Sequence, residues 1–209
     1  MHISASFHFL DFAENYSFLV QDAIQGYHWV NDQATLHPFS VYTTKGRVSY
    51  CVISDHMAHS SIAVHAFRTV VLEDLKAKHP EINEIIYFSD GAGSQYKNFK
   101  NQTNLLYHES DYGIKASWNF FATSHGKNTC DGIGGTVKRL ARRHSSQRVS
   151  SGHILTPAQL YEWTVENISG IKSLFVSSSQ VEAIAEGQKK RFDQSSKLNG
   201  VRECHRILV

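Results

Sequence analysis

The sequence has no uninterrupted apolar run long enough to span a bilayer, which takes about 20 residues, so we expect no membrane partner. Its first residues, MHISASFHFL, lack the charged and then apolar stretches of a secretory signal. Only three cysteines occur among 209 residues: Cys51, Cys130 and Cys204. An odd, widely spaced set favours a reducing intracellular compartment, nuclear or cytoplasmic, over a disulfide framework.

Zinc-binding motifs are also missing, although histidine is abundant. None of the 13 histidines falls in an HExxH pattern and no CxxC pair occurs, so a structural zinc site is unsupported. The glycine-rich stretch DGIGGT (131–136) lacks the spacing and the lysine of a P-loop. We therefore expect no small organic cofactor.

The net charge of +2 is too small to indicate a nucleic-acid partner by itself, but the positive charge is unevenly distributed. The stretch KRLARRHSSQR (138–148) contains five basic residues and no acidic one. Such a patch is suited to contact phosphates, and it is equally compatible with a solvated helix face. The candidate nucleic-acid-binding residues in this stretch are Lys138, Arg139, Arg142 and Arg143.

The hydrophobic pattern predicts an α/β fold. Alternating or β-branched stretches predict strands over residues 3–10, 34–43, 47–54, 84–89 and 114–124. Helical spacing of apolar residues predicts helices over 60–80, 96–110 and 131–144. The order βββαβαβα indicates a mixed five-stranded sheet flanked by helices. We expect this core to span residues 1–148, with a helical C-terminal extension over 149–209 packing on or beside it.

Two aspartates follow the ends of predicted strands. Asp11 follows the first strand and Asp90 the fourth, within LDFAENY and SDGAGSQYKN. If these strands are neighbours, both carboxylates reach the edge of the sheet where ligands usually bind, and Mg²⁺ prefers such oxygen ligands. The alternatives are an Asp-Gly turn at Asp90 and an ordinary surface acid at Asp11, with Glu14 as a substitute ligand.

Three segments carry a resemblance to a known family: DFAENY (11–16), SDGAGSQYKN (89–98) and NFFATSHGKNTCDGIGGTVKRLA (119–141). Over roughly residues 3–145 the chain resembles the ribonuclease-H-like (RNase H-like) core of DDE transposases and retroviral integrases, in a transposon-derived branch. The resemblance implies a third acid at Asp131 and two Mg²⁺ or Mn²⁺ ions held with Asp11 and Asp90 for phosphoryl transfer. Helix capping by Asp131 or Thr129 is the alternative.

Further polar residues lie beside these acids in the sequence. His125 and Lys127 could orient a water or hold the scissile phosphate, or could be plain loop residues. Lys97 and Asn98 could contact nucleic acid or cap a helix. A helical wheel places Gly134 on the face of Asp131, where a small residue would let a DNA backbone approach.

Three functions follow from this reading. The first is a transposase-derived, metal-dependent DNA nuclease and strand-transfer domain that acts in DNA recombination. The second is a co-opted nucleic-acid-binding or interaction module that has lost the chemistry, and the third is an RNase H-like ribonuclease or exonuclease. Under the first, DNA is the expected partner, a homodimer is left open, and target recognition would come from a region outside this chain.

Overall fold

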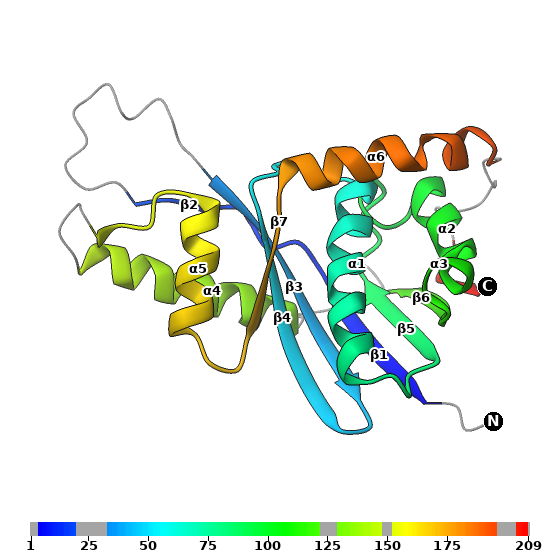
Figure 1. The fold of residues 1–209 in the computed structure, drawn as a ribbon, viewed down its shortest axis with the longest axis horizontal. Coiled ribbons are helices and arrows are strands. Elements are labelled where there is room, and N and C mark those ends of the chain that lie inside the picture. The colour runs from blue at the N-terminus through cyan, green and yellow to red at the C-terminus, as the bar shows by residue number, and fades with distance from the viewer. Residues whose placement is uncertain (1–3, 20–32, 122–128, 148–151, 196–203, 209) are drawn as a thin grey trace.

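A mixed β-sheet with helices on both faces forms the centre of the computed structural model (Figure 1). The structure describes residues 4–19, 33–121, 129–147, 152–195 and 204–208. The strands are β1 (Ala5–Leu10), β2 (Tyr16–Ser17), β3 (Gln33–Thr43), β4 (Gly46–Ser54), β5 (Glu84–Ser89), β6 (Lys115–Phe120), β7 (Lys172–Val176) and β8 (Arg206–Leu208). The helices are α1 (Ser61–Lys78), α2 (Phe99–Leu106), α3 (His108–Tyr112), α4 (Thr129–Ser146), α5 (Pro157–Asn167) and α6 (Ser178–Asp193).

The strand order across the sheet is β7-β4-β3-β1-β5-β6-β8, and β2 pairs with β3 at one end. The three strands predicted first, β1, β3 and β4, form an antiparallel meander, whereas β5 and β6 run parallel to β1. Numbered by their order along the chain, the five predicted strands therefore lie across the sheet in the order 3-2-1-4-5. This arrangement confirms the predicted RNase H-like α/β fold class and makes the first and fourth strands neighbours.

The chain after residue 150 is less purely helical than its pattern predicts. It contains the expected α5 and α6, and it also adds β7 in parallel to β4 and β8 antiparallel to β6. The two added strands are five and three residues long, too short to display a period of two. The extension therefore continues the sheet at both edges as well as covering it.

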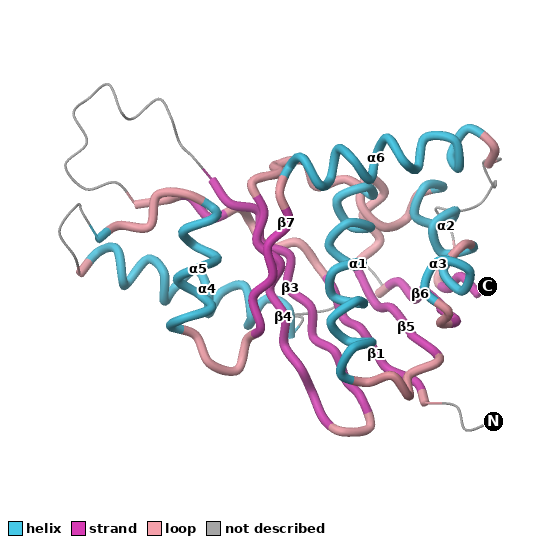
Figure 2. The backbone as a smooth tube through the Cα atoms, in the orientation of Figure 1, coloured by secondary structure: helices cyan, strands magenta, loops and turns pink. Residues whose placement is uncertain are grey.

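Alternating side chains divide the core between the two faces of the sheet. On β4, Tyr50 and Val52 belong to one buried cluster, whereas Cys51 and Ile53 belong to the other. The first cluster is packed beneath α1 and α6, and the second lies beneath α4 and α5. Figures 1 and 2 show these two groups of helices on opposite sides of β3, β4 and β7.

Local capping explains where the predicted helices begin. The Ser60 side chain accepts a hydrogen bond from the backbone of Ala63 at the start of α1. Thr156 does the same for α5, with Pro157 at its first position as predicted. None of the helices in the described ranges is long and apolar enough to cross a membrane.

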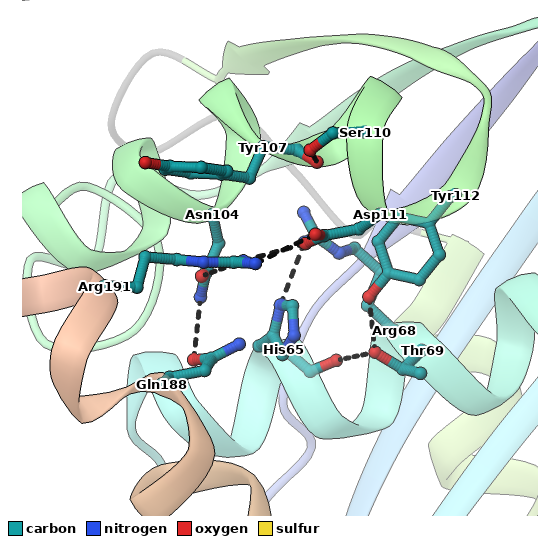
Figure 3. A network of polar contacts seen from close by, with 10 residues as sticks. All are labelled: His65, Arg68, Thr69, Asn104, Tyr107, Ser110, Asp111, Tyr112, Gln188 and Arg191. Carbon is teal, nitrogen blue, oxygen red and sulfur yellow. Dashed lines mark hydrogen bonds and ion pairs between the residues drawn. The ribbon is translucent and has the colours of Figure 1, made fainter.

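A polar network holds α6 against α2 and α3, as Figure 3 shows. Arg191 of α6 makes two hydrogen bonds to the Asp111 carboxylate, at 2.7 and 2.8 Å, and lies 4.4 Å from the centre of the Tyr107 ring. The amide of Asn104 donates to Gln188 at 3.2 Å. This helical layer is therefore fixed on the face of the sheet opposite α4.

Candidate active site

Asp11 and Asp90 stand side by side beyond neighbouring parallel strands. Phe9 of β1 pairs with Phe88 of β5, and each aspartate follows its phenylalanine by two residues. Since side chains alternate along a strand, each aspartate lies on the same face as the phenylalanine before it. The structure thus brings these two predicted acids together at one edge and on one face of the sheet.

The start of α4 lies against the end of β1. The Cys130 thiol donates to the backbone carbonyl of Phe9 at 3.3 Å, and burial raises the pKa of that thiol, which keeps it protonated. Asp131 is the next residue and is exposed in the first turn of the helix. The third predicted acid therefore lies near Asp11, on a different element.

The pKa of Asp11 is raised by its burial and by the neighbouring negative charges. Burial, followed by the charge of Asp90, raises the pKa of Asp11 to about 6, and the charge of Asp131 adds to the rise. A hydrogen bond of 2.9 Å from the backbone N–H of Phe12 acts in the opposite direction. A bound cation would relieve this repulsion.

Asp90 lies in the irregular segment that follows β5, and the turn comes at 93–96 rather than at the Asp-Gly pair. One of its carboxylate oxygens accepts from the backbone N–H of Ala92 at 3.1 Å, and the residue is exposed. The Ser89 hydroxyl donates to the Asp90 carbonyl and accepts from the Trp118 indole, each at 2.9 Å. These contacts hold the backbone in place and are compatible with a ligand role for the exposed Asp90 carboxylate.

Two buried side chains near the acids, Tyr96 and His37, form a pair that the sequence did not predict. The Tyr96 hydroxyl and His37 Nε2 share a hydrogen bond of 3.0 Å, and both side chains are fully buried. Burial and then the charges of Asp11 and Asp90 raise the pKa of Tyr96, while burial lowers that of His37 to about 3. Both groups are therefore neutral supports at neutral pH. Nothing in the sequence distinguishes them from ordinary core aromatics.

The predicted nucleic-acid-binding residues differ in their surroundings. Asn98 caps α2, with its side chain accepting from Asn101 at 3.1 Å and donating to the Gly93 carbonyl at 3.0 Å. Lys97 lies with its Nζ 5.3 Å from the centre of the Phe120 ring. On α4, the Lys138 ammonium donates a hydrogen bond of 3.3 Å to the backbone carbonyl of Glu14. The exposed arginines of this helix are Arg139, Arg142 and Arg143. His125 and Lys127 lie outside the described residues.

The expected role of Gly134 is wrong. This residue is buried, and a Cβ there would lie 2.9 Å from Ala13 Cβ and 3.2 Å from Pro38 Cγ. Its smallness therefore lets α4 approach the sheet rather than letting DNA approach α4. A helical wheel without its partner elements assigns this face incorrectly.

The two carboxylates of Asp11 and Asp90 are suitable ligands for a hard divalent cation. In the part of the chain that the structure describes, no group of three or more His, Cys, Asp or Glu side chains is arranged to hold a metal ion. Mg²⁺ binds through one or two carboxylates together with waters and substrate phosphates. The adjacent, mutually repelling carboxylates of Asp11 and Asp90 meet that requirement.

Three comparisons place the chain among known proteins. A family model described as "Domain of unknown function (DUF8701)" matches residues 4–209. No curated protein matches. Among solved structures, the human cytomegalovirus terminase nuclease domain is similar at 14% identity and a TM-score of 0.30, covering 93% of this chain and 78% of that one. A TM-score this low assigns no activity.

Proposed function

The chain belongs to the DUF8701 family, and we propose that it is a divalent-metal-dependent nuclease that cleaves phosphodiester bonds in nucleic acid. The observation that carries the proposal is the register of β1 and β5, which aligns Asp11 with Asp90 beyond two parallel strand ends. Ligands usually bind at this edge of such sheets.

Each residue has a defined part in this activity. Asp11 and Asp90 would hold Mg²⁺ or Mn²⁺, with Asp131 as a further acid on α4, and the cation supplies charge stabilisation for the phosphate. At pH values well above its pKa of about 6, the Asp11 carboxylate is ionised and able to bind. In the reaction a water oxygen bonds to phosphorus, one P–O ester bond breaks, and a proton passes to the leaving oxygen.

The basic residues supply the sequence-independent part of recognition. The exposed side chains of Arg139, Arg142 and Arg143 follow Asp131 on the same helix. Contacts from such residues to phosphate oxygens position a nucleic acid without reading its sequence. A strand held along α4 would therefore be directed toward the carboxylates.

Cleavage of labelled oligonucleotides in Mg²⁺ or Mn²⁺ tests the proposal. Asp11→Asn and Asp90→Asn should each reduce the rate by on the order of a hundredfold or more, because each removes a charge that stabilises the reaction. The matched control is Asp55→Asn, an exposed aspartate that directly follows β4, a strand parallel to β1. The proposal fails if Asp90→Asn cleaves as fast as the wild type while remaining folded.

The nucleic acid on which the protein acts would distinguish a strand-transfer enzyme from a ribonuclease. Joining of a DNA 3′-hydroxyl to a second duplex would identify the transposase-derived strand-transfer activity. Cleavage of RNA–DNA hybrids but not of duplex DNA would identify a ribonuclease.

The second candidate is a nucleic-acid-binding module without chemistry. It is favoured by one observation, namely that the described residues contain no group of three metal-ligating side chains. Calorimetric titration with Mn²⁺ separates the two candidates, since a silent titration supports the module and rules out the nuclease.

A further inference from the structure

One face of the sheet carries aromatic side chains that lead to the two acids. Along β1, Phe7, Phe9 and Asp11 alternate onto this face, and Phe88 and Asp90 do so along the chain of β5. Since a strand rises about 3.3 Å per residue, the nearest phenylalanine lies only about 6.6 Å from each aspartate along the strand. The rings therefore lie next to any substrate bound at the acids.

The rings form a continuous group, which we call the aromatic platform; its members are Phe7, Phe9, Tyr42, Phe88 and Phe121. The ring centres of Phe9 and Phe88 lie 4.9 Å apart with their planes 13° from parallel. Phe121 lies 6.0 Å from Phe9 and 5.9 Å from Phe88, again nearly parallel to both. Phe9, Phe88 and Phe121 are thus oriented alike next to the acids, whereas the Tyr42 ring is at 78° to that of Phe9.

The aromatic platform is accessible. Phe7 is 42% exposed, and the other four rings are partly exposed. A contiguous group of partly exposed aromatic side chains is unfavourable in water, which favours its use as a binding surface. In contrast, α4 and α5 cover the part of this face formed by β4, β7 and the first half of β3, and α4 begins beside the end of β1.

Positive charge flanks the aromatic platform on two sides. Strand register places Arg206 of β8 in the row that contains Phe9, Phe88 and Asn119. Arg47 of β4 pairs with Tyr42 on the other side. Both arginines are exposed, so rings and cations together form a surface complementary to flat groups linked by anions.

We propose that the aromatic platform stacks unpaired bases of the nucleic-acid strand whose scissile phosphate lies at Asp11 and Asp90, while Arg47 and Arg206 contact the backbone phosphates. This inference rests on the proposed nuclease function and specifies its substrate as single-stranded at the cleavage site. Bases offer a π-face to aromatic side chains whatever their sequence, but within a duplex those faces are stacked on one another. The surface therefore selects unpaired over paired strands.

Binding without metal tests the inference separately from cleavage. In EDTA, anisotropy of a labelled single-stranded oligonucleotide reports affinity, and a duplex of the same sequence measures the preference for unpaired bases. Phe9→Leu and Phe88→Leu should each weaken single-strand binding by about fivefold or more, the effect of losing one stacking contact. The control is Phe99→Leu, a partly buried phenylalanine of α2 whose ring centre lies 6.2 Å from that of Phe192, in the other helical layer.

Arg206→Gln provides a second variant that does not touch the core, because its side chain is exposed. It should reduce the slope of log affinity against log salt by about 0.7, the value for one phosphate contact on a single strand. Equal affinities of wild type, Phe9→Leu and Phe88→Leu would overturn the inference. So would sedimentation showing a dimer of the free protein that Phe9→Leu dissociates, since a second copy would then occupy the surface.

The two proposals fail in different ways. Loss of binding in the platform variants, together with an inactive wild type, supports the single-strand surface and removes the nuclease. Normal binding in those variants, together with cleavage that depends on Asp90, removes the surface and leaves the nuclease.

Discussion

The burial of Asp11 and the repulsion among the acids predict that Asp11→Asn stabilises the metal-free protein. Burial and the charges of Asp90 and Asp131 raise the pKa of Asp11 from 3.8 to about 6. Each pKa unit corresponds to about 1.4 kcal/mol, which gives about 3 kcal/mol before solvent screening. Because the side chain is partly exposed, screening reduces the expected gain to about 1–2 kcal/mol.

The sign of the effect depends on pH. Between pH 3.8 and 6 the folded wild type binds more protons at Asp11 than the unfolded chain, so its free energy of unfolding falls as the pH rises. The asparagine does not titrate. The stability difference between the two proteins should therefore be small at pH 4, rise through pH 6 and approach its full value about one pH unit above the folded pKa of about 6.

Urea unfolding in EDTA at several pH values between 4 and 8 measures this difference. The control is Glu186→Gln on the exposed side of α6, which should show no such rise. Saturating Mg²⁺ should stabilise the wild type but not Asp11→Asn, since ligand binding to the folded state adds to stability. A variant that is less stable than the wild type throughout this pH range would refute the electrostatic reasoning.

The remaining predictions concern the same region. Asp90→Asn should lower the pKa of Asp11 toward 3.8, because it removes the largest charge that raises it; NMR titration of the Asp11 carboxyl carbon measures this, and an unchanged pKa would contradict the contact. Gly134→Ala should destabilise the protein by about 1–3 kcal/mol through crowding against Ala13 and Pro38. Gly135→Ala, with no atom within 4 Å of its Cβ, should instead gain about 0.5–1 kcal/mol of helix propensity. Thermal unfolding of the two glycine variants compares them, and equal effects would show that α4 does not pack closely at Gly134.

Local pattern predicted the five central strands because each is long enough to show its apolar character. The apolar run before Asp90, Ile85 to Phe88, became β5 as expected. The adjacency of Asp11 and Asp90 was inferred only on the condition that the strands be neighbours, and the structure supplies that pairing. The short strands β7 and β8 depend on distant partners and leave no comparable local signal.

Some site features could not be predicted from the sequence. Each of them depends on how separate elements pair or pack against one another. Phe9, Phe88 and Phe121 appear in the sequence as ordinary apolar residues, and only pairing places them on the face of the acids. The Tyr96–His37 pair joins positions 59 residues apart. The close packing of Gly134 requires knowledge of what lies opposite α4.

Anomalous diffraction from crystals soaked in Mn²⁺ tests the central claim most directly, because it locates the cation itself. The account predicts one peak bonded to carboxylate oxygens of both Asp11 and Asp90, and its loss in Asp90→Asn. Well-ordered carboxylates with no peak between them, or a peak elsewhere on the molecule, would contradict it.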